Sequence, residues 1–171
     1  MMVIMAAFLL SVAVTASGVL TPLSQEEAQD LNKSLEQTQV SLENMTLLSG
    51  SLFIFRNNFL IDLIMFVPFA GPFFGMYVMH NTGLAIAAQS IMATTNPPPL
   101  LVLLLLFIFP FTWMEFLAYS IAFSESIWLT WRLIQRKGKG ELVNALILIL
   151  ACLAILMAAA FVEMAMIQAL V

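Results

Sequence analysis

Charged side chains are scarce in this sequence. Only 9% of the 171 residues are Asp, Glu, Lys or Arg, whereas 62% are hydrophobic. A soluble domain of this size needs a larger share of charged residues on its surface to stay dispersed. The six Lys and Arg residues also form no basic groove of the kind that binds nucleic acid. We therefore expect neither a soluble globular domain nor a nucleic-acid partner.

Cysteine and histidine are almost absent. Cys152 is the one cysteine and His80 is the one histidine. A single cysteine excludes a disulfide or a thiolate metal cluster within the chain, and a lone histidine lacks metal-ligand spacing. The sequence also has no Ser/His/Asp set and no nucleotide-binding glycine loop. We expect no catalytic residues, no metal and no cofactor, and hence a protein that is not an enzyme.

Long apolar runs occupy most of the chain. Several of them reach the roughly 20 residues that a helix needs to cross a bilayer. This pattern predicts an all-α, multi-pass bundle of about five transmembrane helices in the cell membrane. Two of these helices are expected to be broken or followed by half-helices. The lipid bilayer is then the first partner of the protein.

Composition divides the chain into three segments. Residues 1–20 are apolar and predict a first transmembrane helix or a signal anchor. Residues 21–58 contain the long polar stretch, whose leucines recur near helical spacing, and predict an extracytoplasmic amphipathic helix. Residues 59–171 are expected to form the membrane bundle. The polar segment also holds two N-x-S/T sequons, at Asn32 and Asn44, which are candidate glycosylation sites if this segment faces the exterior.

Basic residues near the ends of membrane spans indicate the orientation of the chain. Four of the six lie in the short link of residues 132–140, namely Arg132, Arg136, Lys137 and Lys139. This link is predicted to be cytoplasmic. With further spans over residues 59–78, 79–95 and 100–131, the N-terminus is cytoplasmic, residues 21–58 lie outside, and the C-terminus is outside.

Prolines interrupt two of the predicted spans. Residues 59–95 carry the sequence PFAGP at 68–72, and the next span carries Pro110 after three consecutive prolines at 97–99. A continuous helix over residues 100–131 would be about 48 Å long, which exceeds the hydrocarbon thickness. Either its cytoplasmic end protrudes, or residues 100–109 form a half-helix and 112–131 the true span.

Glu115 is an ionisable residue inside an apolar run. It lies about 22 Å along a helix that starts near Leu100, which places it in the inner half of the bilayer. Such a residue is expected to face protein rather than lipid. Tyr119 follows one turn later, and Ala118 and Ala122 are small enough for close helix contact. Glu115 either fixes helix packing through hydrogen bonds or handles a proton or cation.

Two further acidic residues lie in predicted spans. Glu163 is expected near the outer boundary, either wetted at the interface or buried in a helix contact along the small face that includes Cys152 and Ala159. For Asp62, a cation-pathway role competes with pairing to Arg56, and we favour the pairing.

Several short motifs recur in a defined order. They are the pair Asn57-Asn58, glycines at 71 and 75, HNTG at 80–83, P-x-x-x-x-E at 110–115 and AAAFVE at 158–163. Their order and spacing resemble those of the stage II sporulation protein M family of bacterial and archaeal integral membrane proteins. The resemblance covers about residues 53–166. It implies a set of site residues: Asn57, Asn58, Gly75, Asn81, Gly83, Pro110, Glu115 and Glu163.

The chain departs from the family pattern at two places. Phe111 and Thr112 stand where the family has histidine and glycine after the motif proline, so no role of that histidine carries over. The asparagine and glycine of the N-G pair are separated here by Thr82. The family's namesake resembles a scaffold that recruits cell-wall hydrolases during engulfment.

Three functions follow as expectations. The first is a non-enzymatic scaffold or assembly subunit of a membrane protein complex, which binds other integral membrane proteins or copies of itself. The second is a small oligomeric transporter or channel that uses Glu115 at a broken helix. The third is an accessory subunit of a membrane enzyme complex.

Overall fold

The computed structural model describes residues 2–136 and 140–170. These residues form helices and contain no strand, which confirms the all-α class. In chain order the helices are α1 (Met2–Val19), α2 (Gln25–Glu43), α3 (Leu47–Met65), α4 (Ala70–Met92), α5 (Pro99–Leu106), α6 (Pro110–Ile134) and α7 (Leu142–Leu170). Lys137 and Lys139, which contribute to the predicted cytoplasmic link, lie outside the described residues.

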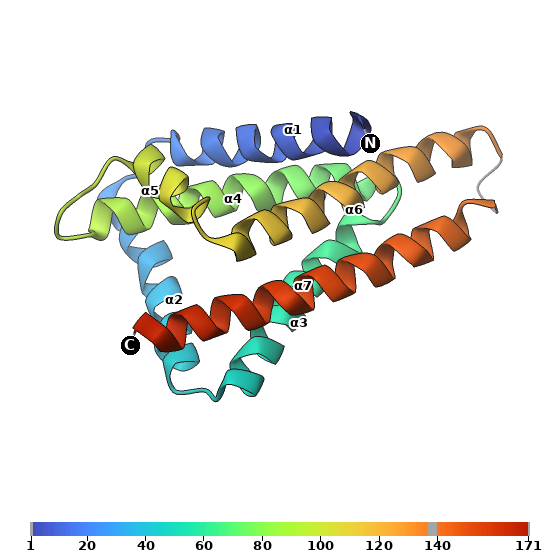
Figure 1. Cartoon of the computed structure of the whole chain (residues 1–171). Helices are drawn as coiled ribbons and strands as arrows, with labels where there is room; N and C mark the ends of the chain where they lie inside the picture. The colour runs from blue at the N-terminus through green and yellow to red at the C-terminus, as the bar shows by residue number, and fades with distance from the viewer. Residues whose placement is uncertain (1, 137–139, 171) are drawn as a thin grey trace.

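The bundle is formed by the helices that pack on one another through α6, namely α1, α3, α4, α6 and α7. Figure 1 shows the N-terminus and the link between α6 and α7 toward one end, and the C-terminus and α2 toward the other. Within the part of the chain that the structure describes, two helices are long and apolar enough to cross a membrane, Leu47–Met65 and Leu142–Ala169. α5 and α6 meet the same test as a bent pair, and Val3–Val19 is a shorter apolar helix. These helices support a membrane protein, and the count of five spans stays a prediction.

The first interruption lies between α3 and α4. Residues 66–69 separate the two helices, so the span expected over residues 59–78 is divided between them. At this turn Phe69 has a φ of 65°, and its backbone N–H donates to Thr130 Oγ1 of α6 at 2.8 Å. The PFAGP sequence therefore ends one helix and begins the next.

α3 begins earlier than the sequence suggested. Thr46 caps the helix by accepting a hydrogen bond from the Ser49 N–H, and α3 then continues to Met65. The expected boundary between an outer segment and the bundle, at residues 58 and 59, thus falls inside one helix. The expected boundary rests on the polar pair Asn57-Asn58, which predicts the start of a span. The pair lies inside α3, where Asn58 has a hydrogen-bond partner on another helix.

The second interruption separates α5 from α6 by a bend of 89°. Pro110 is in the first turn of α6, where its missing N–H removes no helical hydrogen bond. The Thr112 hydroxyl donates to the Leu106 carbonyl at 2.8 Å, and the Trp113 indole donates to the Phe107 carbonyl at 2.7 Å. These side-chain bonds tie the start of α6 to the last carbonyls of α5, and the Leu106 carbonyl also accepts from the Phe109 N–H at 3.1 Å. α5 is therefore a short helix separate from α6, and the role of α6 as the true span stays a prediction.

This bend removes the basis on which the depth of Glu115 was calculated. Because α5 does not continue the axis of α6, distance along the run from Leu100 does not measure depth. Glu115 lies in the second turn of α6, on the side of the molecule to which α2 contributes Leu35 and Leu42. It is not in the half near the link between α6 and α7.

Small residues bring the helices close together. Ala118 and Ala122 of α6, and Cys152 and Ala159 of α7, are fully buried, as expected for a close helix contact. α1 and α4 meet at a second such contact between Gly18 and Gly83. A Cβ added to Gly83 would lie 2.8 Å from the Gly18 Cα and 2.1 Å from the Thr15 carbonyl oxygen. The hydrophobic driving force between helices is weak in lipid. Such contacts therefore stabilise helix pairs through close packing.

Candidate functional site

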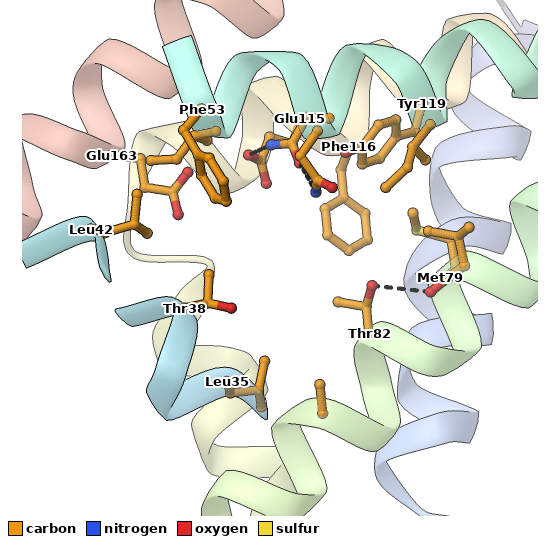
Figure 2. A pocket seen from close by; sticks show the side chains of 16 residues that line it. Leu35, Thr38, Leu42, Phe53, Met79, Thr82, Glu115, Phe116, Tyr119 and Glu163 are labelled. Carbon is orange, nitrogen blue, oxygen red and sulfur yellow. Dashed lines mark hydrogen bonds between the residues drawn. The ribbon is translucent and has the colours of Figure 1, made fainter. Parts of the chain in front are cut away.

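A cavity of about 400 Å³ lies between α2 and the bundle. Its walls come from α2, α3, α4, α6 and α7. Figure 2 shows Glu115 and Glu163 on one side of this space, with Leu35 and Thr82 on the opposite side. The polar side chains that line it are Thr38, Asn57, Asn58, Thr82, Glu115, Tyr119 and Glu163. A cavity that gathers polar groups from several helices is a candidate binding site.

Asn58 and Glu115 form the central contact of the cavity. The Asn58 amide nitrogen of α3 donates to Glu115 Oε1 of α6 at 2.5 Å. Both side chains are partly buried, and they are 57 residues apart in the chain. The contact therefore holds α3 against α6 and fixes the direction of the Glu115 carboxyl group. The sequence predicted a protein-facing Glu115, and the structure supplies its partner.

Glu163 brings a second carboxyl group from α7 to the same cavity. Its Oε2 is buried and has no hydrogen-bond partner among the described residues. Glu115 and Glu163 thus line the same cavity. Two negative charges repel strongly in a low-dielectric region, so such a pair is stable with a bound proton or cation between them. Neither a helical period nor residue spacing could have predicted that α6 and α7 bring them together.

Asp62 is not among the residues that line the cavity. Its side chain is fully buried and both carboxyl oxygens lack a hydrogen-bond partner among the described residues. The expected pairing with Arg56 is wrong, because Arg56 is exposed to the surroundings and Asp62 points into the core. Six positions separate the two residues, whereas helical neighbours are three or four apart. The Cys152 thiol of α7 lies beside Asp62 and donates weakly to the Ala118 carbonyl at 3.6 Å.

Other candidates lie away from the cavity. The His80 ring is 3.2 Å from the Ser17 hydroxyl, and the described residues contain no group of three metal-ligating side chains. Asn32 donates to Glu36 Oε1 at 2.7 Å, and Asn44 donates to the Val40 carbonyl at 2.8 Å. Both asparagines thus lie on or at the end of α2, and their glycosylation stays a prediction.

A basic and aromatic cluster lies at the opposite end of the bundle. The Arg132 guanidinium group lies 4.9 Å from the centre of the Trp128 ring and pairs with Glu141 Oε1 at 2.9 Å. Hydrogen bonds from Asn144 and the neighbouring Arg132 hold the pKa of Glu141 below its usual value. Such a cluster of cation and aromatic rings is typical of a membrane–water boundary.

Comparison with known proteins decides the family. The family model described as Stage II sporulation protein M matches residues 1–166. The chain belongs to this family. The match begins at the first residue, so it includes α1 and α2, which the motif resemblance over residues 53–166 did not cover. Among curated proteins and solved structures, no match was found.

In this stage II sporulation protein M member, the family motif residues fall into two groups by their position in the fold. Asn58, Glu115 and Glu163 meet at the cavity, and Asn57 lines it while donating to Asn58 Oδ1 at 3.4 Å. Asn81 instead donates to the Tyr77 carbonyl of its own helix at 2.7 Å.

The remaining family motif positions shape the backbone. Gly75 and Gly83 are buried at helix contacts, and Pro110 begins α6. The sequence did not reveal the contribution of α2, although the recurrence of Leu35 and Leu42 along it was a signal.

Proposed function

We propose that this chain is a non-enzymatic integral membrane protein that binds a proton or a small cation at Glu115 and Glu163. The observation that supports the proposal most directly is the arrangement of the two carboxyl groups in one cavity. One of them is oriented by Asn58 at 2.5 Å, and the other has an oxygen without a partner in the described chain. A bound cation or proton would reduce the repulsion between them.

The rest of the cavity fits a small cation better than an anion. Among the described residues no Lys, Arg or His side chain lines it, whereas amide, hydroxyl and phenol groups of Asn57, Thr38 and Tyr119 do. Oxygen atoms of this kind are suitable ligands for a hard cation. The proposal corresponds to a small oligomeric transporter or channel in which Glu115 follows a broken helix.

Flux through reconstituted protein tests this proposal. The purified chain is placed in liposomes, and proton or monovalent cation entry is followed under an imposed membrane potential with a pH-sensitive or cation-sensitive dye. Unchanged protein should conduct above the level of empty liposomes. Glu115→Gln and Glu163→Gln should each lower the flux at least about tenfold, which corresponds to about 1.4 kcal/mol.

Glu125→Gln is the matched control, because Glu125 is a buried acidic residue of the same helix that lines a different, smaller cavity beside Trp128 and Leu148. It should conduct normally. Equal flux in the unchanged protein and in both cavity variants would contradict the proposed binding site.

An assembly role is the second candidate, and α2 is the feature that favours it. Only Ala28 and Leu42 are buried in this helix, and its acidic side chains are exposed. An uncovered acidic helix beside the membrane bundle is a suitable contact for a basic region of another membrane protein, or of a complex that this chain joins.

Purification in a mild detergent from the native host tests the assembly role. A scaffold or assembly subunit should be recovered with other chains in a fixed ratio, and Glu115→Gln should leave that ratio unchanged. Haem or metal absorbance in the recovered complex would identify the chain as an accessory subunit of a membrane enzyme. Recovery of this chain alone, as a monomer or homo-oligomer, would contradict the assembly role.

A further inference from the structure

The apolar wall of the cavity is the feature that the proposed function does not use. More than half of the residues that line the cavity are apolar, and they include Leu35 of α2, Phe53 of α3 and Phe116 of α6. A proton or a small inorganic ion at Glu115 and Glu163 occupies only a small part of the space of about 400 Å³. Mostly apolar cavities of roughly 300–1,000 Å³ with a few polar groups are typical sites for small organic molecules. The size and lining of the cavity therefore indicate an organic ligand.

The polar part of the cavity offers hydrogen-bond acceptors. The Asn58 amide already donates to Glu115 Oε1 at 2.5 Å. The Thr82 hydroxyl already donates to the Val78 carbonyl of its own helix at 3.0 Å. Glu163 Oε2, by contrast, is buried and accepts no hydrogen bond from the described residues. Because these donors are used within the chain while carboxyl oxygens remain, the matching group on a ligand is a hydrogen-bond donor.

The charge of the cavity indicates that this donor is a cation. Two carboxyl groups line the cavity, and no Lys, Arg or His of the described chain does. A primary ammonium group has three N–H donors and no acceptor, so it can bond to carboxyl groups from two helices at once. Such charge-assisted hydrogen bonds are stronger than those between neutral groups. The phosphate of an aminophospholipid would lie beside the same carboxyl groups without a basic partner, so a free amine fits better than a lipid headgroup.

The acidic and apolar parts of the cavity lie on different sides. Figure 2 shows Glu115 and Glu163 on one side and Leu35 and Thr82 on the other, with the Phe116 ring projecting into the space. A ligand with its ammonium group at the carboxyl groups thus has its apolar body directed toward α2 and α4. Thr82 is also exposed, so the cavity is open to the surroundings beside α4.

We propose that the cavity binds a primary organic ammonium ion with a compact apolar body, such as an aromatic ethylamine. The inference rests on the proposed function, because it names the class of cation that Glu115 and Glu163 bind. The ammonium group donates to these two carboxyl groups, and the apolar body packs against Leu35 and Phe116. The ring of Phe116 adds a cation–π or stacking contact.

Isothermal titration calorimetry on the purified full chain in a mild detergent tests the ligand class. Phenethylammonium is the probe, because a primary amine is protonated at pH 7, as a Lys side chain is. After subtraction of the heat of partition into empty micelles, it should bind saturably with one molecule per chain. Three relatives should each bind at least about tenfold more weakly. Phenethyl alcohol lacks the charge, phenethyltrimethylammonium lacks the N–H donors, and ethylammonium lacks the ring.

Variants of the acidic side test where the ammonium group binds. Glu115→Gln and Glu163→Gln should each lower the affinity for phenethylammonium at least about tenfold, because each removes a charged acceptor. Glutamine at position 115 keeps an oxygen that can accept from Asn58, so the contact between α3 and α6 is retained. Glu125→Gln, which removes a buried carboxyl group outside this cavity, should bind within about twofold of the unchanged protein.

A variant of the apolar side tests where the body of the ligand lies. Leu35→Trp narrows the cavity on the side of α2 and should lower the affinity for phenethylammonium at least about tenfold. Val40→Trp is the matched control, because Val40 belongs to the same helix and is exposed outside the cavity. It should leave the affinity unchanged.

The outcomes separate this inference from the proposed function. Small-cation flux that depends on Glu115 and Glu163, without binding of phenethylammonium, overturns the organic ligand and leaves the proposed function intact. Equal affinity for phenethylammonium and phenethyl alcohol, or equal affinity in the unchanged protein and both Glu→Gln variants, overturns the inference as apolar partition. Tighter binding of O-phosphoethanolamine than of ethylammonium overturns it in favour of a lipid headgroup. Neither flux nor amine binding in the unchanged protein overturns both.

Discussion

At the scale of single residues, the contact between Asn58 and Glu115 determines how the cavity is built. A side-chain hydrogen bond between helices fixes both rotamers, and within an apolar bundle each partner has few alternatives. The amide of Asn58 comes from the middle of α3, and the carboxyl group of Glu115 comes from the second turn of α6. Their contact therefore links the polar cavity to the packing of two long helices.

Replacing Asn58 should weaken the bundle. Asn58→Ala removes the donor at 2.5 Å from Glu115 Oε1 and leaves that oxygen without its protein partner. We expect the free energy of unfolding to fall by about 1 kcal/mol, which is typical of hydrogen bonds between membrane helices. The unfolding midpoint in detergent, followed by tryptophan fluorescence, measures the change. Asn57→Ala is the control, because Asn57 is exposed and its side chain makes no hydrogen bond to another helix in the described chain. Equal destabilisation by both changes would show that the bond contributes nothing specific.

The sequence predicted the polar residues of the site better than their partners. Glu115 was expected to face protein, and it does. The meeting of Glu115 with Glu163 depends on how α6 and α7 pack, which neither helix specifies by itself. The pairing of Asp62 with Arg56 was wrong because closeness in sequence was taken for closeness on a helix surface. Helix neighbours recur at three and four positions, and a separation of six turns the second residue toward another face.

At the scale of helices, α1 and α4 offer a test of close packing. Gly83→Ala should destabilise the protein by about 1–3 kcal/mol, because the new Cβ would lie 2.1 Å from the Thr15 carbonyl oxygen and the backbones must separate. Gly75→Ala should cost less, since its Cβ would meet the flexible end of Met65 at 2.8 Å. At Gly140 nothing lies within 4 Å, so Gly140→Ala should change the unfolding midpoint little. The unfolding midpoint should therefore be lowest for Gly83→Ala, higher for Gly75→Ala and highest for Gly140→Ala. Any other order would contradict this account of the helix contact.

The N-terminus of α2 makes a prediction about pH. The Ser24 hydroxyl and backbone N–H donate to Glu27 Oε2 at 2.7 and 2.9 Å, and these bonds hold the pKa of Glu27 below its usual 4.5. Because the pKa of Glu27 is lower in the folded state, the cap contributes fully to the stability of α2 when the pH is above the usual Glu pKa. This contribution is lost as the pH falls through the pKa of Glu27 in the folded state. Amide hydrogen exchange in the first turns of α2, corrected for intrinsic rates, should therefore quicken between about pH 6 and about pH 3.

Glu27→Gln supplies the comparison for this cap. Its amide side chain does not titrate, so the corrected exchange in the first turns of α2 should depend much less on pH than in the unchanged protein. If both proteins respond to pH alike, another group controls the end of the helix.

Helix breaks were predicted where the physical signal was strong. Three consecutive prolines and Pro110 indicated an interruption, and Pro110 indeed begins α6 after an 89° bend. The start of α3 was not predicted, because its cap, Thr46, belongs to a stretch that reads as a continuation of the polar segment. The pair Asn57-Asn58 was polar enough to suggest a boundary. Asn58 is acceptable inside the helix because it bonds to Glu115 across the bundle. A short stretch of sequence does not reveal this partner.

At the scale of the whole molecule, the arrangement of the helices argues for a definite orientation. Arg132 and Arg136 lie near the link between α6 and α7, and basic residues beside membrane spans favour the cytoplasmic side. Figure 1 shows α2 and the C-terminus toward the other end. If α1, α3, α4, α6 and α7 each cross the membrane, α2 and the cavity that it covers face outward.

Labelling from one side of the membrane tests this orientation. In a Cys152→Ala background, Gln37→Cys places a thiol on the exposed surface of α2, and Gly140→Cys places one beside the α6–α7 link. A membrane-impermeant maleimide added to intact cells should modify position 37 at once and position 140 only after the membrane is permeabilised. The physical reason is the number of crossings between the two positions, which is three if α3, α4 and α6 all span and α5 does not. Modification of both positions from outside would require an even number of crossings between them. One of these three helices would then lie along the membrane surface, or would enter and leave the membrane on the same side.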